Sequence, residues 1–143
     1  MLSLDSIAFL HLVATAFMAG AIVFVQVVHY PLMAVVGRPT FAHYEQAHTV
    51  RTAWVVGPPM IVELATALWL VAEAMGTSGA AAALAGVALL GVIWVSTAVL
   101  QSPAHRRLLK GFDEAVHRRL VGSNWIRTVA WVARVPIAIA LVP

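Results

Sequence analysis

The chain has 143 residues, of which 62% are hydrophobic and only 10% are charged, with a net charge of +3 and no cysteine. Soluble domains carry about 25% charged and 45–50% apolar residues, and a soluble chain this short could not hide so much apolar surface from water. The composition therefore excludes an ordinary soluble domain. It also excludes disulfides, thiolate metal sites and a cysteine nucleophile, and the basic residues are too few to indicate nucleic-acid binding.

Four segments are long and apolar enough to cross a bilayer, which requires roughly 20 mostly apolar residues. They are expected at residues 4–29, 52–75, 80–101 and 124–142. No Lys or Arg precedes the first segment, and it is longer than the apolar part of a secretory signal, so we interpret it as a retained helix. The sequence therefore predicts an all-α, membrane-embedded four-helix bundle that forms a single domain over residues 1–143.

Two longer connections join these spans. Residues 40–48 are expected to form a short helix between the first and second spans. Residues 102–122 repeat apolar side chains at helical spacing opposite a charged face, which predicts a short interfacial helix lying flat at the lipid surface before the fourth span. Basic residues outside the spans are confined to the two long connections. Because positive loops stay in the cytoplasm, we expect a multi-pass protein of the cell (inner) membrane with both termini non-cytoplasmic.

Each span carries polar residues three or four positions apart, and therefore on one face. Polar groups are costly in lipid, so these faces are expected to turn inward around a shared polar interior. Glu63 and Arg134 fall near mid-membrane and are predicted to pair. Such a pair could have a purely structural role in holding the helices together. Glu63 could also act as a general base, but an ion pair with Arg134 would make it a weaker one. Gln26, Gln101, Asn124 and Arg127 are expected at one level near the cytoplasmic mouth.

Histidines are the second unusual feature, because the chain has six. His29, His48 and His105, with His43 as a further candidate, are expected at the cytoplasmic mouth. Imidazoles are common metal ligands, so the cofactor could be an iron, copper or zinc ion, and two axial histidines could instead hold a haem. His43 and His48 do not have the spacing of a helical metal pair. The alternative is that these histidines bind headgroups, water and backbone carbonyls.

His117 shares a face with charged residues and is expected to be solvated.

Arginines that line a polar cavity can hold an anionic or phenolic oxygen by charge-assisted hydrogen bonds, and Arg51, Arg127 and Arg134 are candidates for this role.

Three segments, "FMAGAIVFVQVVHYPLM", "FAHYEQAHTVR" and "NWIRTVAWVAR", together with the layout of the spans, resemble the small integral membrane proteins grouped with anthrone oxygenases. The resemblance implies oxidation of polycyclic phenolic substrates by molecular oxygen. It points to His48, Arg51, Asn124, Trp125 and Arg127 as site residues and does not indicate a cofactor. A weaker likeness to the small bacterial membrane protoporphyrinogen oxidase rests on short apolar spans and a histidine in the first of them.

The leading hypothesis is a membrane oxidoreductase that acts on a hydrophobic small molecule from the bilayer. The candidate residues are divided by role: catalytic Arg51, Glu63, Asn124, Arg127 and Arg134; cofactor-binding Gln26, Tyr44, Gln101 and Trp125; metal-binding His29, His43, His48 and His105.

The sequence is also compatible with two other classes of protein. The same polar interior could be a path for a proton or small solute in a transporter or binding subunit, since polar residues from His29 through Glu63 to His11 and Glu73 span the membrane. It could also serve packing alone in an assembly factor. The expected partners are the lipid bilayer, a hydrophobic small-molecule ligand and further copies of the chain in a homo-oligomer.

Overall fold

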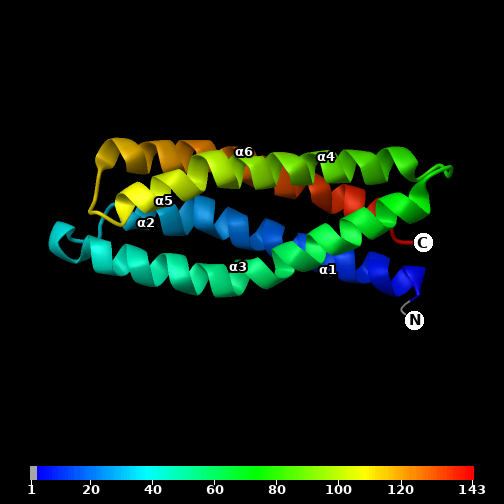
Figure 1. Cartoon of the computed structure of the whole chain (residues 1–143), viewed down its shortest axis with the longest axis horizontal. Helices are drawn as coiled ribbons and strands as arrows, with labels where there is room; N and C mark the ends of the chain where they lie inside the picture. The colour runs from blue at the N-terminus through cyan, green and yellow to red at the C-terminus, as the bar shows by residue number, and fades with distance from the viewer. Residues whose placement is uncertain (1–2) are drawn as a thin grey trace.

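A computed structural model describes residues 3–143, which form four long helices packed side by side as a bundle (Figure 1). The predicted all-α four-helix architecture is confirmed. The elements, in chain order, are α1 (Leu4–Phe24), η1 (Val25–His29), α2 (Tyr30–Met33), α3 (Arg38–Ala74), α4 (Ala80–Ser96), η2 (Thr97–Gln101), α5 (Ser102–Leu108) and α6 (Glu114–Ala140).

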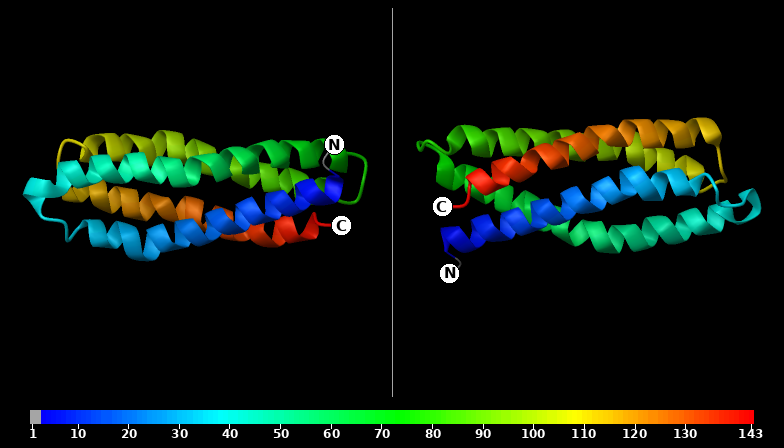
Figure 2. Two further views of the ribbon diagram at one scale, coloured as in Figure 1. Left: turned by 90° about the horizontal axis from the view of Figure 1, so that it is seen from below. Right: turned by 180° about the vertical axis from the view of Figure 1, so that it is seen from behind.

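The chain runs up and down the bundle, so its connections divide between the two ends. Both termini lie at the same end as the short turn between α3 and α4, and the α2–α3 and α5–α6 connections lie at the other end (Figures 1 and 2). We call this second end the mouth of the bundle.

Three of the four long helices are apolar enough to cross a membrane: Leu4–Met33, Arg38–Ala74 and Ala80–Leu108. The fourth, α6, packs against both α1 and α4, but its buried arginines lower its apolar character. Large apolar side chains cover the outside of the bundle, and Trp54 and Val35 are each 78% exposed. An apolar exterior around a polar interior is typical of a helical membrane protein.

The predicted interfacial helix over residues 102–122 is wrong. Residues 102–108 continue the third long helix as α5, and the chain then reverses at Gly111, whose φ of 130° suits glycine. The fourth helix begins at Glu114, where the Asp113 side chain accepts a hydrogen bond from the Val116 amide. The apolar residues at helical spacing, which suggested one flat helix, belong to the end of α5 and the start of α6. These two helices are antiparallel, and their apolar faces pack within the bundle and not against lipid headgroups.

The short helix expected at residues 40–48 is also wrong as a separate element, because α3 runs without a break from Arg38 to Ala74. Its 37 residues, at about 1.5 Å each, exceed the roughly 30 Å hydrocarbon core of a bilayer. Phe41 in the first turns is fully buried and lies 5.0 Å, centroid to centroid, from the Phe112 ring. The mouth therefore has its own core, which extends beyond the apolar spans.

Two π-helical segments, η1 and η2, interrupt the first and third long helices just before Pro31 and Pro103. A helical proline lacks an N–H and clashes with the carbonyl four residues earlier, and a wider π turn relieves both problems. Both segments contact the same turn of α6, because Gln26 in η1 donates to the Val121 carbonyl and Gln101 in η2 donates to Ser123. Such π turns often mark functional sites.

We expect Phe41→Ala to lower the free energy of unfolding by about 3–5 kcal/mol, because it empties a fully buried site in the core of the mouth. Reversible unfolding in mixed micelles measures this value. Trp54→Ala is the control, since that side chain is 78% exposed and its loss leaves no internal cavity. Equal, small effects of the two substitutions would mean that the start of α3 is not packed into the bundle.

Candidate functional site

A first polar network lies deep in the bundle around Glu63, which is fully buried. Thr15 donates to Glu63 Oε1 at 2.9 Å and the Trp131 indole N–H donates to Oε2 at 2.9 Å. Arg134 Nε and Nη2 both lie 3.1 Å from Oε1. The predicted pairing of Glu63 with Arg134 is confirmed, and both carboxylate oxygens have partners.

The same arginine extends the network to the other helices. Arg134 Nη1 donates to the Gly86 carbonyl, and Nη2 lies 3.4 Å from His11 Nε2. Thr66 donates its only hydroxyl proton to the Val62 carbonyl at 2.7 Å, so it accepts from His11 Nδ1 at 2.8 Å. His11 is then a neutral imidazole whose Nε2 accepts from Arg134. This network links all four long helices by hydrogen bonds, so we interpret its role as structural.

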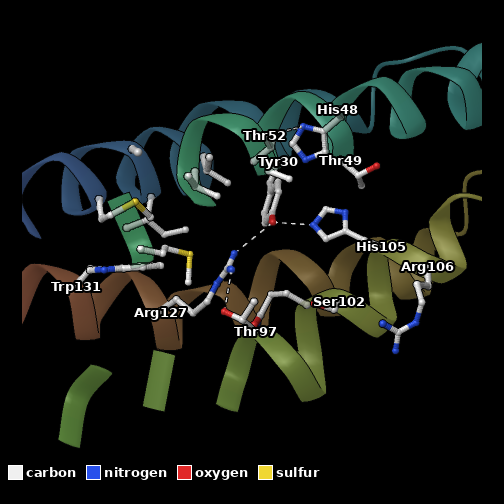
Figure 3. A pocket seen from close by; sticks show the side chains of 18 of the residues that line it. Tyr30, His48, Thr49, Thr52, Thr97, Ser102, His105, Arg106, Arg127 and Trp131 are labelled. Carbon is white, nitrogen blue, oxygen red and sulfur yellow. Dashed lines mark hydrogen bonds between the residues drawn. The ribbon is translucent and has the colours of Figure 1, made fainter. Parts of the chain in front are cut away.

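A second polar cluster lies nearer the mouth and centres on Tyr30. The Tyr30 hydroxyl lies 3.0 Å from His105 Nε2 (Figure 3). On the other side of the ring, His105 Nδ1 lies 2.5 Å from Glu45 Oε1. Arg127 Nη2 donates to the same hydroxyl at 3.4 Å. A carboxylate, an imidazole, a phenol and a guanidinium thus form one continuous hydrogen-bonded chain, in which the guanidinium is a fixed donor and the other groups can exchange protons.

Arg127 has only uncharged hydrogen-bond partners among residues 3–143. Its Nε and Nη2 donate to Asn124 Oδ1 at 2.9 and 2.5 Å, and its Nη1 donates to Thr97 at 3.2 Å. Asn124 in turn donates to Gln26 at 2.8 Å. A buried guanidinium without a carboxylate partner is poised to bind an anionic or oxygen-bearing ligand.

His48 is held at the edge of this cluster by its Nδ1, which lies 2.9 Å from His29 Nε2 and 3.1 Å from the Thr52 hydroxyl. The His29 and His48 rings stack with centroids 4.4 Å apart. Two axial ligands of a haem stand on opposite faces of the macrocycle, and these two rings leave no space for one between them. The pair therefore cannot supply the two axial ligands of a haem.

Glu45, His48 and His105 each offer one ligand atom to a group whose atoms all lie within 4.8 Å of one another. Glu45 is fully buried, and its Oε2 is the one buried side-chain nitrogen or oxygen without a hydrogen-bond partner among residues 3–143. Two histidines and a carboxylate are a common ligand set for transition metals.

A cavity of about 360 Å³ adjoins this cluster. Tyr30, His48, His105 and Arg127 form its polar wall, and most of the remaining lining is apolar (Figure 3). Its exposed lining residues lie on α3 and at the end of α5, so the cavity opens sideways between these helices. The full lining comprises Met18, Ala21, Ile22, Val25, Tyr30, His48, Thr49, Thr52, Ala53, Val56, Met60, Thr97, Gln101, Ser102, His105, Arg106, Leu109, Arg127 and Trp131.

Most of the residues predicted for the mouth come together there. The group comprises Gln26, His29, Tyr44, His48, Gln101, His105, Asn124 and Arg127. His43, Arg51 and Trp125 are instead exposed and do not line the cavity. Glu63 and Arg134 belong to the deep network and not to the mouth. Glu73, expected to extend the polar stripe of its span, is also exposed.

His117, expected to be solvated, is buried and its Nε2 lies 2.8 Å from the Tyr30 carbonyl. That prediction is wrong because the flat helix on which it relied does not exist. Sequence reasoning also missed Glu45 and Tyr30. Glu45 stands three residues before His48 on one helix, a spacing that places both on the same face and recurs in carboxylate metal sites.

No family model, curated protein or solved structure matches this chain.

We expect Glu63→Met and Arg134→Met each to lower the free energy of unfolding by about 3–5 kcal/mol, because each leaves a buried charge unpaired. The double substitution should be less destabilising than the two single effects added together, since it removes both charges. Unfolding in mixed micelles measures all three variants.

Glu114→Met is the matched control for this cycle. Its pair with Arg118 is exposed on both sides (66% and 67%), so the loss should be below about 1 kcal/mol. Strict additivity of the two buried substitutions would contradict the assigned ion pair.

Proposed function

We propose that this protein is an integral-membrane oxidoreductase that acts on a hydrophobic small molecule taken from the bilayer. The observation that carries the proposal is a mostly apolar cavity of about 360 Å³ that opens sideways and ends on Tyr30, His105 and Arg127. Ligand sites combine an apolar lining with a few convergent polar groups in this way, and their volumes lie in the same range.

The cavity suggests how such a molecule would bind. Its sideways opening lies between helices that are apolar enough to cross a membrane, so a lipid-soluble compound could enter without passing through water. The apolar body would pack against Met18, Met60 and Trp131. A polar atom of the ligand would then reach the donors of Arg127 and the hydroxyl of Tyr30.

The polar wall supports acid–base chemistry on the bound molecule. The Tyr30 hydroxyl lies 3.0 Å from His105 Nε2 and accepts from Arg127, so it could exchange a proton with the bound substrate. Arg127 would stabilise negative charge that develops on a substrate oxygen. Deprotonation makes an organic molecule richer in electrons and easier to oxidise.

Molecular oxygen is the proposed oxidant. In an oxidase reaction it accepts two electrons and two protons from the substrate and leaves as hydrogen peroxide. In an oxygenase reaction one oxygen atom replaces two hydrogens of a substrate CH₂ group as a carbonyl, and the other leaves as water. Both reactions balance without an external reductant.

A proton or solute path is less well supported than an oxidoreductase. No hydrogen bond among residues 3–143 joins the mouth cluster to the deep network around Glu63. Met18, Ile22 and Met60 belong to a buried apolar cluster between the two. A path through the bundle would need water or a conformational change across this apolar layer.

We further propose that α6 crosses the membrane with the other three helices and that the mouth faces the cytoplasm. At the mouth, Arg38 stands at the start of α3, Arg106 and Arg107 lie near the end of α5, and Lys110 lies in the α5–α6 connection, whereas the turn at the opposite end carries no basic residue. Assembly into a homo-oligomer stays part of the proposal, although a single bundle already supplies every residue that lines the cavity.

Tyr30→Phe and Arg127→Met should each lower turnover at least about 100-fold, because one removes the proton carrier and the other the cationic hydrogen-bond donor. The assay follows oxygen uptake, peroxide and product in proteoliposomes supplied with a panel of lipid-soluble phenols. Arg107→Met is the control, since this exposed arginine does not line the cavity. Turnover that survives both cavity substitutions would refute the assigned site.

The natural absence of cysteine allows a direct test of orientation. A thiol reagent that cannot cross membranes should label Thr77→Cys in intact spheroplasts, because the α3–α4 turn faces outward. Lys110→Cys, in the α5–α6 connection, should react only after the membrane is opened. The reverse pattern would invert the proposed topology.

A further inference from the structure

We propose that Glu45, His48 and His105 bind one divalent transition-metal ion in the wall of the cavity. The proposal deepens the function above, on which it rests for its catalytic meaning, by naming the cofactor of the same site. The ligand atoms come from α3 and α5, two helices that border the opening of the cavity.

The spacing of the three groups fits a single ion. One nitrogen from each histidine and one carboxylate oxygen all lie within 4.8 Å of one another. Metal–ligand bonds of about 2.0–2.2 Å bring ligand atoms into this range around one ion. Small side-chain rotations would therefore be enough to complete the site.

The unpartnered oxygen of Glu45 is an independent indication. Glu45 is fully buried, His105 contacts its Oε1, and its Oε2 has no hydrogen-bond partner in the described part of the chain, residues 3–143. A buried polar atom without a partner is energetically costly, and more so when it carries charge. A bound cation would supply the missing partner, and it would neutralise a carboxylate that only a histidine now contacts.

The surrounding hydrogen bonds suit metal-ligating histidines, which usually donate their second ring N–H to a fixed acceptor. His48 contacts His29 and Thr52 only through Nδ1, which leaves Nε2 for the ion. His105 can bind the ion through Nδ1, in which case the ion replaces its present contact with Glu45 Oε1, while Nε2–H donates to the Tyr30 hydroxyl. His29 thus becomes a positioning residue and not a ligand.

The ligand set indicates which metal would be functional. Two histidines and one carboxylate with further positions open are typical of non-haem iron(II) centres that react with oxygen. His48 and His105 both line the cavity, so the open positions would face a bound substrate. Bound iron(II) would give molecular oxygen a place to bind beside the substrate, which the organic side chains alone do not provide.

The test uses full-length protein without a polyhistidine tag, stripped with a chelator and titrated with cobalt(II) as a spectroscopic probe. Wild-type protein should bind one equivalent and develop visible d–d bands. Glu45→Gln and His48→Ala should each weaken binding at least about tenfold. His43→Ala is the matched control, because this exposed histidine of α3 lies outside the ligand group and should leave the affinity unchanged.

Two variants are used because Glu45→Gln alters a fully buried side chain and could affect folding, whereas His48 is partly exposed. Iron(II)-loaded protein should also bind nitric oxide with the spin-3/2 signal of an iron site that has open positions. Absence of cobalt binding by wild-type protein, or equal affinities for His43→Ala and His48→Ala, would overturn the metal site.

These outcomes are distinct from those that test the function. Oxygen-dependent turnover by fully metal-free protein would refute the metal site and leave the oxidoreductase proposal intact. A cobalt site of the predicted ligands, in a protein that oxidises none of the lipid-soluble phenols, would support the metal site and count against the proposed reaction.

Discussion

The buried ion pair between Glu63 and Arg134 is the interaction on which the bundle depends. Charged groups inside an apolar bundle must find partners within the protein, because lipid offers none. Thr15, Trp131 and Arg134 together satisfy both oxygens of Glu63, and Arg134 also reaches the Gly86 carbonyl on α4. The pair thus fixes how the four helices face one another, and it places Trp131 at the inner end of the cavity.

The polar interior divides into two parts with different properties. The deep network is closed, and the apolar cluster that includes Met18 and Met60 separates it from the mouth. The mouth cluster is incomplete, since within residues 3–143 Glu45 keeps an oxygen without a partner and Arg127 has only uncharged partners. Buried polar groups that lack a hydrogen-bond partner are rare in proteins, and a bound ligand or ion can supply the missing partner. The position of this cluster beside a mostly apolar cavity is what favours chemistry there over packing alone.

Much of the fold follows from the sequence, because apolar length and the inward turn of polar faces determine a membrane bundle. The pairing of Glu63 with Arg134 was predictable from their similar depth, and the gathering of His29, His48 and His105 from their positions near span ends. The errors have two causes. Helical periodicity does not distinguish a surface helix from two antiparallel helices that meet at Gly111, so the burial of His117 was missed. Residues 40–48 were expected to form a short connecting helix and not the start of a long one, and the candidates chosen from it did not include Glu45.

The central claim is that an ion completes the polar cluster at Glu45. Anomalous diffraction from crystals grown with cobalt(II), recorded on both sides of the cobalt absorption edge, tests it most directly. One edge-dependent peak among Glu45, His48 and His105, beside the cavity, is the predicted result. A map with no peak in that cluster, or with cobalt only at exposed histidines such as His43, would contradict it.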